Sequence, residues 1–357
     1  MSSEYRTSRN EINRRKALSK ISKILIGVVA TTAIGTSTYV LNQQRGETNL
    51  GNLTVYSGRG ESLVGSIINN FETETGIKPN VRYAGSAELA LTILEEGMNS
   101  PADIFFSQDA GALSALSKES RLLTISDKLL QKVKPQFRSS KREWVGITGR
   151  VRTVDYNVNL VKKEDLPESI WGFIEPKWKG NIGWAPTNGS FQSFITAFRK
   201  IEGEEKTREW LLGIIDNDPQ IYSKNSPIVE ALGRGEIQVG FVNNYYLHRF
   251  KTNNPEFPVA HHYTINDAGS MVNISGIGII NTTRNKELCE QFIEYMLSNE
   301  VQNYFVSQTY EYPLSIGSEM SSSRRNLEQI SIPNLDLNEL DDLEGTLNLL
   351  REVEAFG

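Results

Sequence analysis

Strand-like and helix-like segments alternate along this chain from residue 53 onward, and this alternation limits the folds open to it. Residues 53–58 are rich in β-branched side chains and end in a Ser-Gly turn, which is typical of a strand. Residues 61–75 place apolar side chains on one helical face, and Gly76 fits the end of that helix. Two further pairs of such patterns follow, at 81–84 with 87–97 and at 103–106 with 112–117. The alternation predicts a mostly parallel sheet with helices on its faces.

A second alternating set begins near residues 151–157. It has strand patterns at 181–186, 220–222, 237–242 and 275–280 and helical patterns at 191–200, 227–233, 286–297, 300–308 and 337–353. We therefore predict two α/β lobes, with residues 48–150 and 281–357 in lobe 1 and residues 151–280 in lobe 2. The chain is expected to cross between the lobes near 148–155 and 275–283. A cleft between two lobes is a natural place to enclose a small ligand.

The first 47 residues have the features of an export leader. They carry eight Lys or Arg against three Glu, and an apolar stretch at residues 24–33 is followed by small residues. This order predicts a secretory signal and a periplasmic location. Residues 13–18 resemble a twin-arginine export motif. An ordinary signal, or an uncleaved membrane anchor over residues 24–41, stays open as an alternative.

Composition excludes several classes of protein. Cys289 is the only cysteine, which rules out an internal disulfide, a cysteine-based zinc site and an iron–sulfur cluster. The chain carries a net charge of −5 although its leader is basic, so the remainder is acidic and unsuited to nucleic acid. We find no nucleophile–base pair, no Gly-x-Ser-x-Gly elbow and no carboxylate dyad, so we do not expect an enzyme.

Two features could carry binding chemistry. Tyr245 and Tyr246 follow a predicted strand and two asparagines, at the edge of a sheet where ligands bind. Two phenols with a pKa near ~10 ionise at neutral pH only beside a strong Lewis acid such as ferric iron; otherwise such rings simply pack. The turn at residues 187–190 opens a predicted helix, which suits a bound anion or a routine N-cap.

Four motifs in order extend this interpretation: Leu-Thr-Val-Tyr-Ser-Gly-Arg at 53–59, Pro-Ala-Asp-Ile-Phe at 101–105, Ala-Pro-Thr-Asn-Gly-Ser at 185–190 and Val-Asn-Asn-Tyr-Tyr at 242–246. Over roughly residues 51–357 the chain resembles the periplasmic ferric-iron-binding proteins of ABC transporters. The resemblance implies a type II solute-binding fold with two hinge crossovers. It also implies that Fe³⁺ is captured between the lobes and delivered to a membrane permease. We expect a monomer.

The resemblance assigns roles residue by residue. Tyr245 and Tyr246 match the family's paired iron ligands. A loop for a synergistic phosphate or carbonate is matched by Asn188, Gly189 and Ser190, and the side chains that help to hold this anion are matched by Asn225 and Asn243.

This chain also departs from the family pattern. Many members have a His in place of Gly60 and a carboxylate in place of Gln108, and others have a tyrosine in place of Gly189. The remaining iron ligands and the identity of the anion therefore stay open. Additional cleft residues are predicted at Ser57, Arg59, Gly60, Gln108 and Arg150. The two arginines could each hold a second anion or form a salt bridge. The alternative function is binding of a small oxyanion or organic solute by the same fold.

Overall fold

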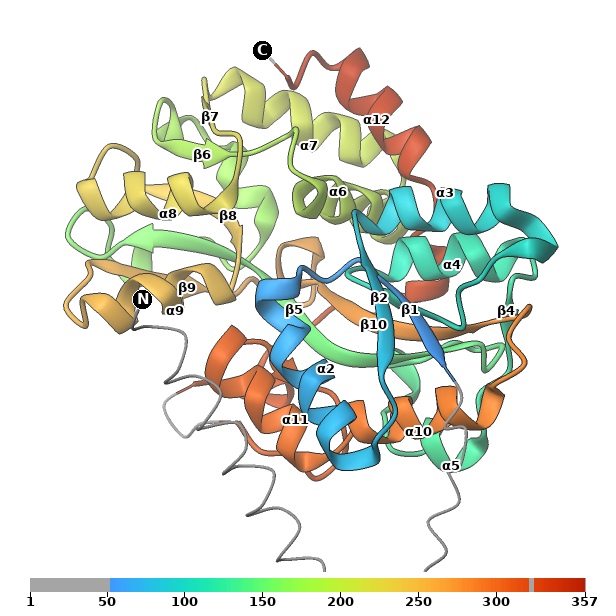
Figure 1. The fold of residues 1–357 in the computed structure, drawn as a ribbon. Coiled ribbons are helices and arrows are strands. Elements are labelled where there is room, and N and C mark those ends of the chain that lie inside the picture. Colours follow the sequence, from blue (N-terminus) through green and yellow to red (C-terminus); the bar gives the residue numbers. More distant parts are fainter. Residues whose placement is uncertain (1–51, 321–323, 357) are drawn as a thin grey trace, which may run out of the picture. The chain divides into compact units, whose positions relative to one another are not determined.

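The structure is a computed structural model that describes residues 52–320 and 324–356. The predicted signal, twin-arginine motif and anchor lie outside these residues. Within the described part of the chain, no helix combines the length and apolarity that crossing a membrane requires. The described strands form a sheet in the order β2-β1-β3-β10-β5-β8-β6-β7 (Figure 1).

The first half of the sheet confirms the predicted alternation. Strands β1 (Leu53–Ser57), β2 (Pro79–Tyr83) and β3 (Ile104–Ser107) are parallel, and β10 (Val272–Ile280) runs antiparallel to β3. Three helices connect or follow these strands: α2 (Glu61–Thr75), α3 (Ser86–Glu96) and α4 (Ala110–Lys118). Helix α2 ends at Gly76, which has the left-handed φ of 72° that glycine adopts readily. Short elements β4 (Leu122–Leu123) and α5 (Asp127–Leu130) follow.

Strand β5 (Trp144–Asn157) joins the two halves of the sheet. Its first part pairs with β10 and with β11 (Tyr312–Pro313), and its last part pairs with β8 (Val239–Asn243) and β9 (Val259–His262). All 14 residues of β5 are buried. The strand predicted at residues 151–157 is therefore only the last part of β5, and the continuous burial explains why the remainder shows no alternating pattern. The predicted division into lobes at 150/151 and 280/281 stays a prediction, because strand pairing does not fix where a lobe ends.

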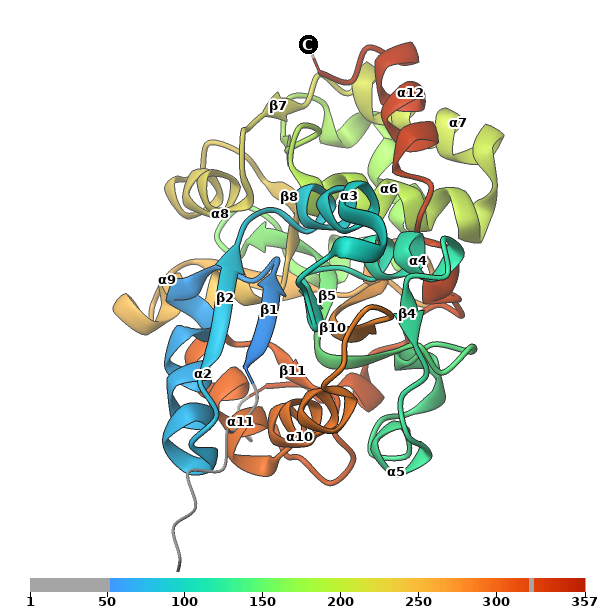
Figure 2. The ribbon, with the colours of Figure 1, turned by 45° about the vertical axis from the view of Figure 1, so that its right-hand side comes forward.

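The second half of the sheet holds β8, β9, β6 (Ile182–Trp184) and β7 (Gln220–Ile221), with β6 parallel to both β7 and β8. Its helices are α6 (Gly189–Glu202), α7 (Glu204–Asp216), α8 (Asn225–Arg234) and α9 (Tyr245–Asn253). In Figure 2 helices α6 and α7 lie in the upper part of the molecule, and α8 and α9 lie at its left side. Helices α6, α8 and α9 each begin at residues that the sequence marked as candidate site residues.

The C-terminal part contains α10 (Lys286–Met296), α11 (Asn299–Tyr304), a π-helix (Phe305–Thr309) and α12 (Leu343–Glu352). The helix predicted over 337–353 is too long. Residues Leu337–Glu339 form a short 3₁₀ turn instead, and α12 begins only after Asp342, whose side chain accepts a hydrogen bond from the Gly345 amide. A second aspartate, Asp336, caps the 3₁₀ turn in the same manner. Two N-caps close together therefore divide the amphipathic pattern.

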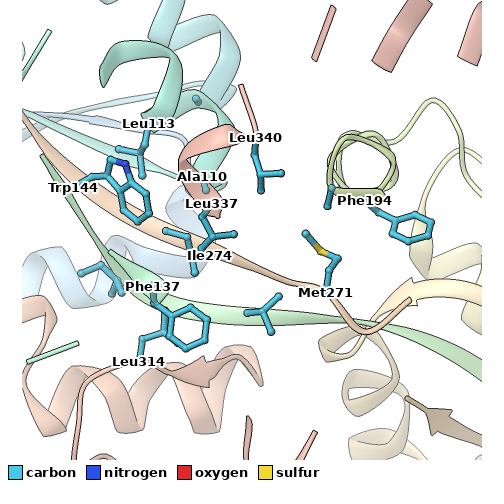
Figure 3. Packing of buried hydrophobic residues seen from close by; sticks show 14 of the residues in the cluster. Ala110, Leu113, Phe137, Trp144, Phe194, Met271, Ile274, Leu314, Leu337 and Leu340 are labelled. Atoms are coloured by element: carbon cyan, nitrogen blue, oxygen red, sulfur yellow. The ribbon is translucent and has the colours of Figure 1, made fainter. Parts of the chain in front are cut away.

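The hydrophobic core is built on both faces of β5 and β10. Figure 3 shows Trp144 and Ile274 of the sheet with Leu113 of α4 and with Leu337 and Leu340 of the C-terminal segment. In the second half, aromatic rings pack edge-on around α6, including Phe191 against Trp184 and Phe194 against Trp210. Edge-to-face packing of this kind stabilises a core beyond its buried area. The starts of the α-helices that carry candidate residues are therefore fixed on a rigid base.

Candidate anion and metal site

The tyrosine pair opens helix α9 directly after β8. The Tyr245 and Tyr246 rings lie 4.2 Å apart between centroids at an interplanar angle of 30°. Tyr245 is buried and Tyr246 is half-buried. Burial raises the pKa of Tyr245 above its ordinary value of 10, and the neighbouring Tyr246 adds to this rise, whereas Arg150 opposes it. The Tyr245 phenol is therefore neutral at pH 7, and its ionisation requires a cation bound beside it.

Asn244 fixes the start of this helix. Its backbone amide donates to the Val151 carbonyl, at 3.0 Å, and its side-chain oxygen accepts from the Val151 amide at 2.9 Å. Its Nδ2 donates to the Tyr310 carbonyl at 3.3 Å. Asn244 thus ties the tyrosine pair to the middle of β5 and to the segment after the π-helix. The sequence showed Asn244 as a turn residue but gave no signal of this bridging role.

The predicted anion loop forms a compact polar cluster. Asn188 Oδ1 accepts from the Ser190 amide at 3.1 Å and from the Ser190 hydroxyl at 2.6 Å, which is the N-cap of α6. Asn225 Nδ2 donates to Asn188 Oδ1 at 3.2 Å and to Ser190 Oγ at 3.1 Å. Asn225 is only 1% exposed, and its Oδ1 has no hydrogen-bond partner among the residues that the structure describes. The cap expected of an ordinary helix start is thus present, and one buried acceptor is left over.

Two buried arginines, Arg150 and Arg152, lie close to the tyrosine pair, and a third, Arg59, lies close to Arg150. Arg59 forms a 2.7 Å ion pair with Glu311, which is the salt bridge that the sequence left open as one of two alternatives. Arg150 instead donates to two backbone carbonyls, those of Gln108 and Ile274. Each of these two guanidiniums has a buried Nε without a hydrogen-bond partner, as does that of Arg152.

Arg152 is a site residue that our sequence reasoning missed. It is 2% exposed, donates to the Phe241 carbonyl at 2.6 Å and lies 3.4 Å from Asn243 Oδ1. Its guanidinium stands 5.5 Å from the centre of the Phe191 ring, in the first turn of α6. Burial lowers the pKa of Arg152 to about 9, and both tyrosines of the pair act against this shift. The sequence feature that could have identified Arg152 is its spacing of two residues from Arg150, because this spacing puts both side chains on the same side of β5.

Arg152 therefore connects the parts of the site. It contacts Asn243 on one side and the start of α6 on the other, and it is close enough to the tyrosine pair to interact electrostatically with both phenols. The positive charges of Arg150 and Arg152 favour added negative charge next to the tyrosine pair. Phenolates or a bound oxyanion would supply it.

Hydrogen bonds and one close glycine contact fix the turns that follow β1 and β3. Ser57 Oγ donates to the Arg59 carbonyl at 2.8 Å, and Ser86 Oγ accepts from the Gln108 amide at 2.9 Å. A Cβ at Gly58 would lie 2.0 Å from Ser86 Oγ, so only glycine allows these two turns to approach. Gly60 precedes α2 and offers no ligand side chain. Gln108 is bound to Arg150 through its carbonyl oxygen, so the structure joins these two predicted residues.

Other candidate ligands have structural roles. His261 Nδ1 lies 2.6 Å from Asp155 and His262 Nε2 lies 2.7 Å from the Pro167 carbonyl, so the adjacent imidazoles have separate partners. Cys289 is buried, and burial raises its pKa to about 12. Among residues 52–320 and 324–356, no three His, Cys, Asp or Glu side chains gather as a metal site. A cavity of about 600 Å³ between α5 and residues 334–338 contains none of the candidate residues.

His248 gives the site helix a pH dependence. It lies on α9, with its ring 5.2 Å from that of His261 and 5.6 Å from that of Tyr310. Burial lowers its pKa from 6.5 to about 3, and His261 adds to the effect. A base whose pKa is lower in the folded state stabilises the fold fully above pH 6.5 and loses that contribution as the pH falls toward 3. The loss is at most about 1.4 kcal/mol per pH unit.

We therefore expect His248→Gln to flatten the fall of the thermal midpoint between pH 7 and pH 4.5, measured on iron-free protein. Asn253→Gln, at an exposed position of the same helix, is the control and should keep the parent slope. An unchanged slope in His248→Gln would show that protonation of this residue does not act on stability.

Comparison with known proteins defines the class. The chain folds as a type II periplasmic solute-binding protein: iron-bound HitA from Pseudomonas aeruginosa superposes with a TM-score of 0.78 at 31% identity, covering 85% of this chain and 99% of that one. Trichodesmium FutA in complex with iron and citrate gives a TM-score of 0.75 at 29% identity, with coverage of 85% and 99%.

Residues 99–342 match the family described as bacterial extracellular solute-binding proteins, and this chain belongs to that family. The major ferric iron-binding protein of Neisseria meningitidis serogroup B is 30% identical over 311 residues, which cover 85% of this chain and 93% of that protein. The resemblance to ferric-iron-binding proteins that the sequence motifs indicated is thereby confirmed. The family is one of solute-binding transport proteins and not of enzymes.

Proposed function

We propose that this protein is the substrate-binding component of an ABC iron importer. It captures Fe³⁺ in a cleft between its lobes through Tyr245 and Tyr246, together with a synergistic anion, and delivers it to a membrane permease. The observation that carries this proposal is the stacked tyrosine pair next to the buried guanidinium of Arg152. The iron-binding relatives support it, since their names state the same cargo.

The residues divide the chemistry between them. Each phenol loses its proton to solvent as the trivalent cation binds, and the resulting phenolates are hard anionic donors that suit Fe³⁺. Arg150 and Arg152 favour the ionised phenols, because each carries positive charge close to them. The anion binds the cluster of Asn188, Ser190 and Asn225 at the start of α6, where the helix dipole attracts it and where it replaces Asn188 Oδ1 as the acceptor for Ser190 and Asn225.

The remaining coordination positions are proposed to be filled by the exogenous anion. Gly60 has no side chain and Gln108 is a neutral amide, so neither replaces the His and the carboxylate of many relatives. Phosphate or carbonate fits this role, and so does a polycarboxylate, since the Trichodesmium relative holds citrate with its iron. We further propose export to the periplasm through the twin-arginine-like leader, which is consistent with an extracellular family.

Ferric loading tests the proposal. Purified protein is incubated with ferric nitrilotriacetate in the presence and absence of phosphate, carbonate or citrate, and then desalted. We expect about one iron per chain by elemental analysis and a visible charge-transfer band from phenolate to iron. Colourless protein that retains no iron with any of the three anions would contradict the proposal.

The alternative is a solute-binding protein for a small oxyanion or organic solute. Gly60 and Gln108 favour it, because both replace iron ligands. Calorimetry with phosphate and citrate in the absence of iron distinguishes the two functions. Tight binding of one of these anions without iron, and no binding of Fe³⁺, would support the alternative.

A substitution at Gly189 tests anion binding separately from folding. A Cβ at this position would meet no atom within 4 Å, so the site has room for a side chain. We expect Gly189→Leu to change the free energy of unfolding by less than about 1 kcal/mol, because it replaces an open glycine at a helix start. It should weaken anion-dependent iron loading at least about tenfold, or about 1.4 kcal/mol.

Anion titrations of ferric loading and urea unfolding together check this prediction. Lys200→Leu, at an exposed position near the other end of α6, is the matched control and should change neither. An unaltered anion dependence in Gly189→Leu would exclude the loop from anion binding.

A further inference from the structure

The chain between the 3₁₀ turn at Leu337–Glu339 and helix α12 connects the two halves of the molecule a third time, after β5 and after the segment that leads from β9 into β10. In Figures 1 and 2 this segment, in red, descends from α12 beside α6 to α4. We call residues 337–342 the strap. Helix α4 belongs to the first half of the sheet and α6 to the second.

The strap is anchored to α4 on one side. Ser114 Oγ donates to the Leu337 carbonyl at 3.1 Å, and Leu337 and Leu340 are both buried. A Cβ at Gly111 would lie 2.5 Å from the Leu340 carbonyl oxygen, so the strap rests directly on the backbone of α4. Figure 3 shows Leu340 and Leu337 beside Ala110 and Leu113.

The continuation of the strap is anchored to α6. Arg199 Nη2 pairs with Asp342 Oδ2 at 2.9 Å, and Arg199 Nη1 donates to the Asp342 carbonyl and to Thr346 Oγ1. The hydroxyls of Thr196 and Thr346 lie 2.8 Å apart, and both residues are buried. Leu349 and Leu350 complete the contact from within α12.

The ion pairs of the strap change from α4 to α6 between two consecutive residues. Asp341 pairs with Lys118 of α4, and Asp342 pairs with Arg199 of α6. Since the two residues are neighbours, their Cα atoms are about 3.8 Å apart, and the backbone has no spare length between the two ion pairs. Helices α4 and α6 both begin beside candidate site residues, α4 two residues after Gln108 and α6 at Gly189. Any movement of α4 relative to α6 therefore changes the spacing of the two sides of the site.

We propose that the strap limits how far the two halves can separate. Asp341 carries the ion pair to α4, and Asp342 carries the ion pair to α6. Its contacts are made by the chain itself and need no ligand. The strap therefore limits the separation whether the cargo is ferric iron or another solute. Solute-binding folds close by rotation of two lobes about a few connecting segments, and a taut additional connection narrows that rotation.

A four-residue Gly-Ser-Gly-Ser insertion between Asp341 and Asp342 tests this proposal. It leaves every anchor in place and adds up to about 13 Å of slack. The separation of the halves is measured in ligand-free, full-length protein by spin labels at Glu95→Cys on α3 and Glu230→Cys on α8, both exposed positions. Cys289 is the only native cysteine and is buried, so the labels go to the chosen sites.

The expected result is a distance distribution that is broader and shifted to longer distances than in the parent. The same insertion between Asn254 and Pro255, in an exposed turn within the second half, should leave the distribution unchanged. If the strap insertion does not fold, the Asp341→Asn/Asp342→Asn double variant decides, with a smaller shift in the same direction. A folded strap variant with the parent's distribution would overturn the proposal, whatever the outcome of ferric loading.

Discussion

Replacing both Tyr245 and Tyr246 with Phe is expected to abolish ferric iron binding and leave the fold intact. The rings would still stack at the start of α9, since their 4.2 Å packing does not need the hydroxyls. Each lost hydroxyl costs about 1 kcal/mol of stability or less. Both anionic oxygen donors would be gone, however. We expect the affinity for Fe³⁺, measured by competition with citrate, to fall at least about a thousandfold, or about 4 kcal/mol.

The visible charge-transfer band gives a second readout, because only a phenolate bound to iron produces it. It should be absent in the double variant and altered in each single variant. The matched control is Tyr312→Phe, which removes a buried hydroxyl that lies 3.3 Å from that of Tyr263, outside the tyrosine pair. That variant should bind iron as the parent does. Retained ferric affinity in the double variant would refute the assignment of the two tyrosines.

The elements that could be predicted from sequence are those whose signals are local. The strand and helix from Leu53 to Thr75 follow from β-branched residues, helical periodicity and a terminal glycine, all within one short segment. The start of α6 at Asn188 is likewise a local N-cap pattern. The tyrosine pair could be singled out because an adjacent pair after a strand is visible in the sequence itself.

The remaining features depend on partners far apart in the chain. Glu311 pairs with Arg59, 252 positions away, and no local pattern marks either residue as a member of a buried ion pair. The spacing of Arg152 from Arg150 is visible in the sequence, but its place opposite Asn243 follows only from the register of β5 with β8. Tertiary contacts of this kind are set by the packing of the sheet and not by propensity, which is why sequence periodicity did not find them.

The tail illustrates the same limit in a simpler form. Its amphipathic pattern predicted a helix over 337–353, but the two aspartate caps at Asp336 and Asp342 divide it. The reason is again tertiary, since Lys118 and Arg199 draw Asp341 and Asp342 toward different helices. A helical periodicity therefore located the apolar face of the tail but not the point where the chain changes direction.

Replacing Glu311 with Gln is expected to cause the largest loss of stability of the variants considered. Both carboxylate oxygens are engaged, one with Arg59 at 2.7 Å and the other with Thr148 Oγ1 at 2.5 Å, and the ion pair is almost fully buried. The change leaves the Arg59 charge buried without a counter-ion and close to Arg150. Breaking a buried pair in this way costs about 3–5 kcal/mol. Urea unfolding should show a lower midpoint with an unchanged slope.

The pH dependence of this loss identifies its electrostatic origin. Burial alone would raise the pKa of Glu311, but Arg59 and Arg150 outweigh it and hold the pKa below its ordinary value of 4.5. A carboxylate with a lowered folded-state pKa stabilises the protein above pH 4.5 and loses this contribution as the pH falls. The difference between parent and Glu311→Gln should therefore be full at pH 7 and shrink below pH 4.5. Glu236→Gln, which breaks an exposed pair with Arg234, should leave the urea midpoint nearly unchanged. A Glu311→Gln variant no less stable than this control would mean that the buried pair does not hold the Arg59 turn against β5.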